Sequence, residues 1–221
     1  MVKKVESMKE KNLTIVKNKK RYILLFLCLI LFCIILINVL NGNIQGFDSN
    51  IYNLITSIKS NFMDMFFRTI TRFGDEEVLI LIAVACLIFI KNRRIGGSIA
   101  INLASVGLIN HILKEIIQRP RPPIELRMVE ESSFSFPSGH AMASMAFYGL
   151  IMYYIYNYIE NKKVKNIICA ILSLLILLVG ISRIYLGVHY ASDVTAGFLF
   201  SIIYLVLYIT FILKLIGIKE K

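Results

Sequence analysis

The sequence predicts an all-α integral membrane protein: a bundle of six transmembrane helices with an interfacial amphipathic segment after the first span. Three observations predict this class. Hydrophobic residues make up 57% of the 221 residues, more than a soluble globular domain usually contains. Several apolar runs approach the length that crosses a bilayer. Basic residues flank these runs, as they do at the ends of membrane spans.

The first apolar run follows a lysine-rich segment, as in a signal peptide. The run is too long for a signal peptide, however, and no cleavage site of small residues follows it, so it is interpreted as an uncleaved first helix. The other spans are near the length that a bilayer requires, and the second, which is the shortest, is expected to tilt or lean on its neighbours. The six predicted spans are residues 22–40, 76–90, 95–116, 139–158, 166–182 and 193–213.

The positions of the basic residues predict the orientation. With six spans, the N-terminal tail, the loops after spans two and four and the C-terminal end share one side, which the positive-inside rule makes cytoplasmic. We therefore expect a basic cytoplasmic tail (1–21), a membrane domain (22–216) and a cytoplasmic C-terminal end (217–221). The basic residues concerned are Lys3, Lys4, Lys9, Lys11, Lys17, Lys19, Lys20, Arg21, Lys91, Arg93, Arg94, Lys162, Lys163, Lys165, Lys214, Lys219 and Lys221.

The composition also excludes other classes. The net charge of +11 is explained by this topology and by attraction to anionic lipids, and no interleaving of aromatic and basic residues indicates a nucleic-acid surface. The four cysteines, Cys28, Cys33, Cys86 and Cys169, lie inside apolar runs without metal-ligand spacing. They are interpreted as small hydrophobic core residues.

Residues 48–73 form an amphipathic segment. Its apolar residues recur at helical spacing, and Asp48, Ser49 and Asn50 are available as helix caps. One interpretation is a helix, or two, packed over the outer end of the bundle. The other is a lateral gate for a lipid substrate, and the two are compatible. The apolar residues are Ile51, Leu54, Ile55, Ile58, Phe62, Met65, Phe66, Ile70 and Phe73.

Two polar patches mark the outer ends of spans three and four. In the first, Lys114 ends a helix that Pro120 and Pro122 cannot continue, so basic side chains lie over the bundle mouth. Such residues can also simply cap carbonyls and reach toward headgroups. In the second, Pro137 to His140 suit a helix start whose free N–H groups favour an anion. The alternative there is an ordinary cap with an incidental histidine.

The third patch, Ser182 to Asp193, is the most specific. A serine, an arginine, a histidine and an aspartate lie between two apolar spans, where charged groups are costly and usually functional. If span six begins near Tyr190, His189 and Asp193 lie four residues apart on one helix face. A carboxylate there can hold one imidazole N–H and leave the other nitrogen nucleophilic. The alternative is an ion pair that only orients the helix.

Together the patches resemble the three motifs of the type 2 phosphatidic acid phosphatase (PAP2) superfamily: K-x6-R-P (Lys114 to Arg121-Pro122), P-S-G-H (Pro137 to His140) and S-R-x5-H-x3-D (Ser182-Arg183 to Asp193). The resemblance implies that His189 attacks phosphorus and forms a phosphohistidine, that Asp193 orients it, and that His140 protonates the leaving oxygen and then activates water. It implies no metal or other cofactor, because cationic side chains take that place. The phosphate-binding residues would be Lys114, Arg121, Ser138, Gly139 and Arg183, with Arg119 an alternative to Arg121.

Other polar residues receive weaker interpretations. His111 is expected to bond to a neighbouring helix, with pocket lining as the alternative. Glu125, Glu130 and Glu131 are expected on a solvated loop face, with a part in substrate selectivity as the alternative.

The resemblance predicts a phosphatase that removes the terminal phosphate of a lipid phosphate or diphosphate at the outer leaflet. The substrate and the surrounding membrane lipids are the expected partners, without nucleic acid, and the oligomeric state is not predicted. Undecaprenyl diphosphate, phosphatidate and phosphatidylglycerol phosphate are the substrates considered, with a leaning toward the isoprenyl diphosphate. The alternatives are a lipid-linked phosphotransferase, and a non-catalytic lipid-binding or transport protein, which should have lost His140, His189 or Asp193.

Overall fold

In the computed structural model of the chain, all regular elements within residues 2–218 are helical. The structure describes the backbone of residues 2–218 and the side chains of residues 19–218. Short 3-10 turns cover Arg72–Gly74 and Ile124–Leu126, and a π-helical turn covers Tyr208–Ile212. The helices are α1 (Val2–Leu40), α2 (Gln45–Thr56), α3 (Asn61–Thr71), α4 (Glu76–Phe89), α5 (Arg93–Ile117), α6 (Gly139–Tyr158), α7 (Lys162–Tyr185), α8 (Ala191–Leu207) and α9 (Leu213–Leu215).

Four helical segments within the described residues are long and apolar enough to cross a membrane, and the chain is therefore a multi-pass membrane protein. They agree in position with predicted spans one, three, five and six. The 14-residue α4 and the 20-residue α6 coincide with predicted spans two and four but are not among the four. An α-helix of 14 residues is about 21 Å long, shorter than a hydrocarbon core of about 30 Å. The four segments are Lys19–Leu40, Arg93–Ile117, Lys162–Tyr185 and Ala191–Leu215.

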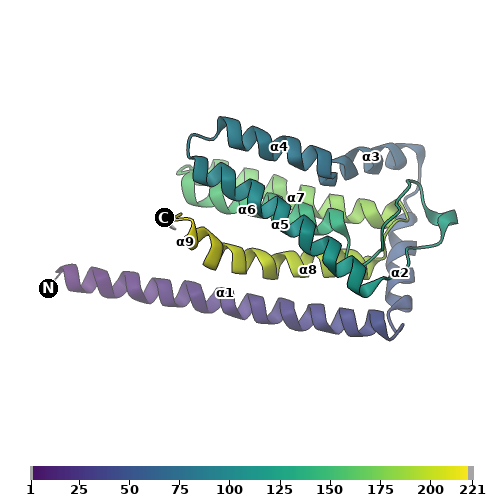
Figure 1. Ribbon diagram of the computed structural model, residues 1–221, viewed down its shortest axis with the longest axis horizontal. Helices are drawn as coiled ribbons and strands as arrows, with labels where there is room; N and C mark the ends of the chain where they lie inside the picture. Colours follow the sequence, from purple (N-terminus) through teal and green to yellow (C-terminus); the bar gives the residue numbers. More distant parts are fainter. Residues whose placement is uncertain (1, 219–221) are drawn as a thin grey trace.

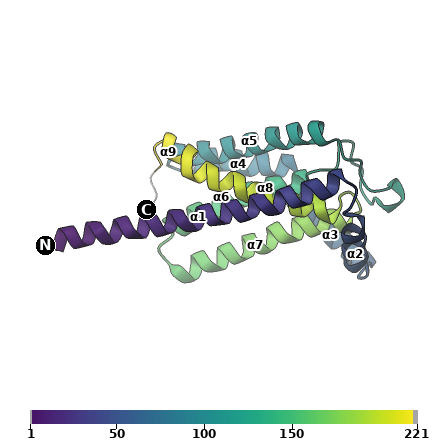
Figure 2. The same ribbon diagram turned by 90° about the horizontal axis from the view of Figure 1, so that it is seen from below.

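Helices α4 to α8 run alongside one another, and α1 packs on α8 at the edge of the bundle (Figures 1 and 2). Helix α6 is central, because it contacts α5, α7 and α8. The beginning of α1 and helix α9 lie at one end of the bundle, and α2, α3 and the 118–138 loop lie at the other (Figure 1). The basic side chains predicted for the tail before Lys19, and Lys219 and Lys221, lie outside the described residues.

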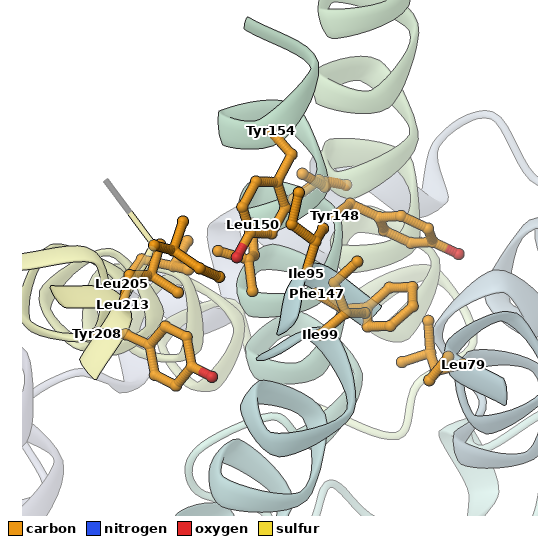
Figure 3. Packing of buried hydrophobic residues seen from close by; sticks show 13 residues of the cluster. Leu79, Ile95, Ile99, Phe147, Tyr148, Leu150, Tyr154, Leu205, Tyr208 and Leu213 are labelled. Carbon is orange, nitrogen blue, oxygen red and sulfur yellow. The ribbon is translucent and has the colours of Figure 1, made fainter. Parts of the chain in front are cut away.

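The main hydrophobic core lies between α4, α5, α6 and α8 (Figure 3). Leu79, Phe147 and Leu150 are completely buried there. Three buried tyrosines bring hydroxyl groups into this core, and those of Tyr154 and Tyr208 find partners on α5. The Tyr154 hydroxyl lies 2.5 Å from Ser98 Oγ, and the Tyr208 hydroxyl donates to the Ser98 carbonyl over 2.7 Å. A buried hydroxyl without a partner would be destabilising, so these bonds fix α5 against α6 and α8.

The amphipathic segment forms two helices, α2 and α3, which pack on α7 and α8 at the end of the bundle. This arrangement agrees with the first of the two interpretations, in which the segment packs over the outer end of the bundle. The predicted caps are wrong, because α2 already begins at Gln45. Asp48 is instead buried and accepts hydrogen bonds from the backbone N–H and the hydroxyl of Ser192, each over 2.8 Å. The segment is thus tied to the first turn of α8, which contains Asp193, the last residue of the third motif.

Candidate active site

A cavity of about 900 Å³ lies between α4 and α5 and continues to the polar end of the bundle. Its polar end is lined by Lys114, Arg121, Gly139, His140 and His189, so residues of all three motifs meet in one space. The rest of the wall is mainly apolar and comes from α4 and α5. Its apolar residues include Ile80, Ala83, Val84, Leu87, Ala100, Leu103, Ala104, Val106 and Leu108.

His189 lies in the tight turn between α7 and α8. Gly187 makes this turn with a φ of +70°, and a Cβ at this position would collide with the carbonyl of Leu126. The Leu186 carbonyl accepts the Met128 N–H over 2.9 Å, so the 118–138 loop is tied to the same turn. This backbone geometry explains the glycine and holds His189 at the cavity with 2% of its surface exposed.

The partners of His189 define its tautomer. Arg121 Nη1 lies 3.2 Å from His189 Nε2, and a guanidinium can only donate, so Nε2 is the acceptor nitrogen. The proton of the neutral ring is then on Nδ1, which lies 3.4 Å from both Asp193 Oδ2 and Ser135 Oγ. This is the arrangement that the spacing of His189 and Asp193 predicted. The lone pair of Nε2 lies at the cavity, where Arg121 donates to it in this structure.

Burial lowers the pKa of His189 well below 6.5, and the charges of Arg121, Arg183 and Lys114 lower it further. Each of these effects disfavours the imidazolium. The ring is therefore neutral at neutral pH, which is the form that a nucleophile requires.

Asp193 is completely buried and accepts hydrogen bonds on both carboxylate oxygens. Arg119 Nη1 donates to Oδ1 over 2.5 Å, and Ser135 Oγ donates to Oδ2 over 2.5 Å. The Tyr190 N–H adds a bond of 2.9 Å to Oδ2. A buried carboxylate persists only where such partners compensate for lost hydration.

Arg119 is held by this network and does not line the cavity. Its Nη2 donates to Asp48 Oδ2 over 2.7 Å, and its guanidinium lies 4.2 Å from the centre of the Tyr190 ring. Asp48, Arg119 and Asp193 thus form a chain of alternating charges from α2 to α8. The geometry favours Arg121 over Arg119 as the arginine nearer to a bound phosphate.

The remaining cations contact the 118–138 loop. Lys114 Nζ donates to Ser133 Oγ over 2.8 Å, and Arg121 Nε donates to the Ser133 carbonyl over 2.6 Å. Arg183 donates to Thr71 Oγ1 over 2.8 Å and pairs with Glu131. Arg183 is buried beside the cavity rather than in its lining.

The prediction that Glu131 belongs to a solvated loop face is wrong. Its carboxylate forms ion pairs with both Arg121, at 3.3 Å, and Arg183. The sequence could not indicate this, because the loop folds back on the motifs through contacts between distant residues such as Met128 and Leu186. A carboxylate held by two guanidiniums indicates that this corner of the cavity favours an anion.

The second motif starts α6, as predicted. Ser138 is the N-cap, and its side-chain oxygen accepts the Ala141 N–H over 3.5 Å. Ser138 is fully buried and is not in the cavity lining, whereas Gly139 is. The N-terminus of α6 therefore lies at the polar end of the cavity, and a helix N-terminus favours an anion. His140 Nε2 lies 2.8 Å from Asp75 Oδ1.

Several contacting residues were missed by the sequence analysis. Asp48, Asp75, Ser133 and Ser135 touch the motif residues but lie outside the motifs themselves. Only Ser135 carried a weak signal, because it lies two residues before the second motif. His111 lines the cavity, which was the less favoured of its two interpretations. Among the described residues, no group of three or more His, Cys, Asp or Glu side chains could hold a metal ion.

The fold and this cavity together define a class: a helical membrane protein whose charged pocket, with the imidazoles of His140 and His189, opens into an apolar groove. The PAP2 superfamily model matches residues 96–216. The chain is 35% identical to phosphatidylglycerophosphatase B of Bacillus subtilis over 178 residues, which cover 77% of this chain and 86% of the relative. It is 28% identical to an undecaprenyl-diphosphatase of Sulfolobus acidocaldarius over 188 residues, covering 82% and 86% respectively.

A comparison with solved structures indicates the same family as the sequence comparison. The PAP2-type phosphatidylglycerolphosphate phosphatase of Bacillus subtilis superposes with a TM-score of 0.76 at 29% identity, over 86% of this chain and 96% of that one. This chain belongs to the PAP2 superfamily. It is accordingly an enzyme of the phosphatase class, and it groups with the membrane lipid phosphatases of this superfamily.

The lowered pKa of His189 gives a direct prediction. When the pH falls through 6.5, an ordinary histidine takes up a proton, whereas the His189 ring stays neutral because burial and the neighbouring cations oppose its charge. Nitrogen NMR of protein labelled in its histidines, in detergent, measures this, and His189→Gln identifies the signal. A His189 midpoint at or above 6.5 would contradict the inferred environment.

Proposed function

We propose that the enzyme removes the terminal phosphate of a lipid phosphate through a phosphohistidine on His189. The single observation that supports this proposal most strongly is the cavity. In it, a neutral buried imidazole, two cations and a second histidine meet at the polar end of a mainly apolar groove. The lipid phosphatases among the relatives also favour a lipid substrate.

In the first half-reaction, the Nε2 lone pair of His189 attacks phosphorus, and the bond between phosphorus and the leaving oxygen breaks. The proton of a protonated His140 passes to that oxygen. Asp193 stabilises the positive charge that develops on His189, because its carboxylate lies 3.4 Å from Nδ1. Lys114, Arg121, Arg183 and the Gly139 N–H stabilise the charge on the phosphoryl oxygens. Ser138, whose N–H donates to the Asp193 carbonyl over 3.1 Å, supports them by capping α6.

In the second half-reaction, His140 accepts a proton from water as the water oxygen attacks phosphorus. The bond between phosphorus and His189 Nε2 breaks, phosphate leaves, and His140 is again protonated. Splitting the reaction in this way lets one set of cations serve both transition states. We propose that side chains alone supply this stabilisation and that no metal is required. Arg119 acts in this scheme as a positioning residue for Asp193.

The groove between α4 and α5 would receive the hydrocarbon part of the substrate.

Of the substrates considered, we propose a glycerolipid phosphate, because the relative with 35% identity is a phosphatidylglycerophosphatase. Undecaprenyl diphosphate is the alternative substrate, because a second relative is an undecaprenyl-diphosphatase. A panel of both substrates with purified enzyme separates the two by their kcat/KM values.

We also propose the six-span topology, with α4 and α6 as the second and fourth spans, a cytoplasmic tail at 1–21, a catalytic membrane domain at 22–216 and a cytoplasmic end at 217–221. The arrangement of the helices supports this, because the beginning of α1 and helix α9 lie at one end of the bundle, and the motif loops lie at the other (Figures 1 and 2). The active site would then face outward.

The covalent intermediate can be trapped directly. With p-nitrophenyl phosphate carrying labelled phosphate, rapid quenching at alkaline pH should leave label on wild-type protein and none on His189→Gln. His140→Gln keeps the nucleophile, so it should still take up label but release it more slowly, by about 100-fold or more. Equal labelling of His189→Gln and wild type would refute the assignment, and a loss of labelling with chelator would refute the metal-free mechanism.

The groove can be tested by narrowing it. Phenylalanine in place of Ala100 and Ala104 should lower kcat/KM for a long-chain phosphatidate by about 10-fold or more, equivalent to about 1.4 kcal/mol. Hydrolysis of p-nitrophenyl phosphate should change little, because this substrate has no chain. Ile101→Phe is the matched control, because Ile101 is exposed on the same helix and does not line the cavity. Unchanged phosphatidate kinetics in the double variant would argue against this route.

The orientation can be tested with single cysteines in a chain whose four native cysteines are replaced. A cysteine at Glu130, which is exposed in the 118–138 loop, should react with an impermeant thiol reagent in intact cells. A cysteine at Lys162, exposed at the start of α7, should react only after lysis. The reverse pattern would invert the proposed topology.

A further inference from the structure

Asp75 holds the second histidine in the same way that Asp193 holds the first. Asp75 Oδ1 lies 2.8 Å from His140 Nε2, and both residues line the cavity that contains His189. Asp75 lies outside the three motifs and outside residues 96–216, which the family model matches. We propose that Asp75 is a positioning residue for His140, so that each histidine of the site has its own carboxylate partner. This inference rests on the proposed function.

The local backbone indicates that the contact is not incidental. Asp75 is the N-cap of α4, where an aspartate usually accepts a backbone N–H from the first helical turn. The Asp75 side chain makes no such capping bond. The carboxylate contacts His140 instead of the backbone N–H groups of the first turn of α4.

The turn before α4 is fixed against the helix that bears His140. The Tyr148 hydroxyl, on α6, donates to the Phe73 carbonyl over 2.8 Å. Gly74 packs against the His140 ring so closely that a Cβ there would lie 2.9 Å from His140 Cδ2 and 2.7 Å from a methyl group of Val179. The imidazole is therefore confined by backbone on one side and by the Asp75 carboxylate at Nε2.

This geometry assigns the nitrogen that exchanges protons with the substrate. A carboxylate accepts, so His140 Nε2 donates its proton to Asp75, and Nδ1 is the second nitrogen. In the first half-reaction, the proton on Nδ1 passes to the leaving oxygen as its bond to phosphorus breaks. In the second, Nδ1 takes a proton from the attacking water. Asp75 stays ionised throughout, and the pKa of its carboxyl is lowered, first of all by the hydrogen bond from His140.

The two histidines then differ in which ring nitrogen faces the carboxylate. His189 is protonated on Nδ1, toward Asp193, and presents Nε2 to phosphorus. His140 keeps a proton on Nε2, toward Asp75, and in the proposed mechanism it exchanges its second proton at Nδ1, with the leaving oxygen or with water. Because each carboxylate fixes which nitrogen keeps its proton, the nucleophile and the proton donor have separate roles.

The test compares two leaving groups in the Asp75→Asn variant. Rapid quenching measures the rate of phosphoenzyme formation from dioctanoyl phosphatidate, whose alkoxide must be protonated, and from p-nitrophenyl phosphate, whose leaving group needs no proton. The rate from phosphatidate should fall by about 100-fold, within the range for general acid catalysis. The rate from p-nitrophenyl phosphate should stay close to that of the wild type, which also shows that the variant is folded.

Controls separate the possible failures. Glu125→Gln removes a negative charge from an exposed loop position and should change neither rate. Asp75→Glu should restore much of the phosphatidate rate. If Asp75→Asn lowers both rates equally, or neither, then Asp75 does not act through His140, while the proposed phosphatase mechanism stands. If wild-type enzyme forms no phosphoenzyme from either substrate, the proposed function itself fails, and this inference fails with it.

Discussion

Charged groups at the end of an apolar helical bundle must be compensated by other charged or polar groups, and this constraint explains most of the site. The buried Asp193 and Asp48 are joined through Arg119, whose side chain is 12% exposed, in an unbroken chain of ion pairs that links α8, the 118–138 loop and α2. Removing one partner of a buried ion pair typically costs about 3–5 kcal/mol. The network therefore fixes the helix ends relative to one another, and the orientation of the His189 imidazole follows from it.

The same constraint explains the elements that surround the motifs. The amphipathic segment places Asp48 where it can neutralise Arg119, and the turn before α4 places Asp75 where it can accept from His140. The 118–138 loop contributes Ser133, Ser135 and Glu131 to cations and carboxylates of the motifs. In this way a bundle with mainly apolar walls can present a cluster of positive charge to an anionic headgroup. The apolar groove between α4 and α5 leads to the same cluster.

Much of this protein could be predicted from the sequence, because spacing within a single helix or turn is a local property. The start of α6 at Gly139, the proximity of His189 and Asp193, and the end of α5 before the prolines all follow from such spacing. The motif residues and the family could be predicted for the same reason. Glu131 was placed wrongly, and the caps proposed for the amphipathic segment were wrong as well. In both cases the side chain is held by a partner more than 50 residues away in the chain.

The sequence by itself therefore determined the helical membrane class, the three motifs and the residues available for phosphoryl transfer, because composition and short-range spacing encode them. Only the tertiary structure decided which arginine is committed to Asp193, which nitrogen of His189 accepts from Arg121, and which carboxylate contacts His140. Those properties depend on contacts between α2, the turn before α4, the 118–138 loop and the motif helices. No local pattern of residues specifies such contacts, because they arise only when distant segments meet at one end of the bundle.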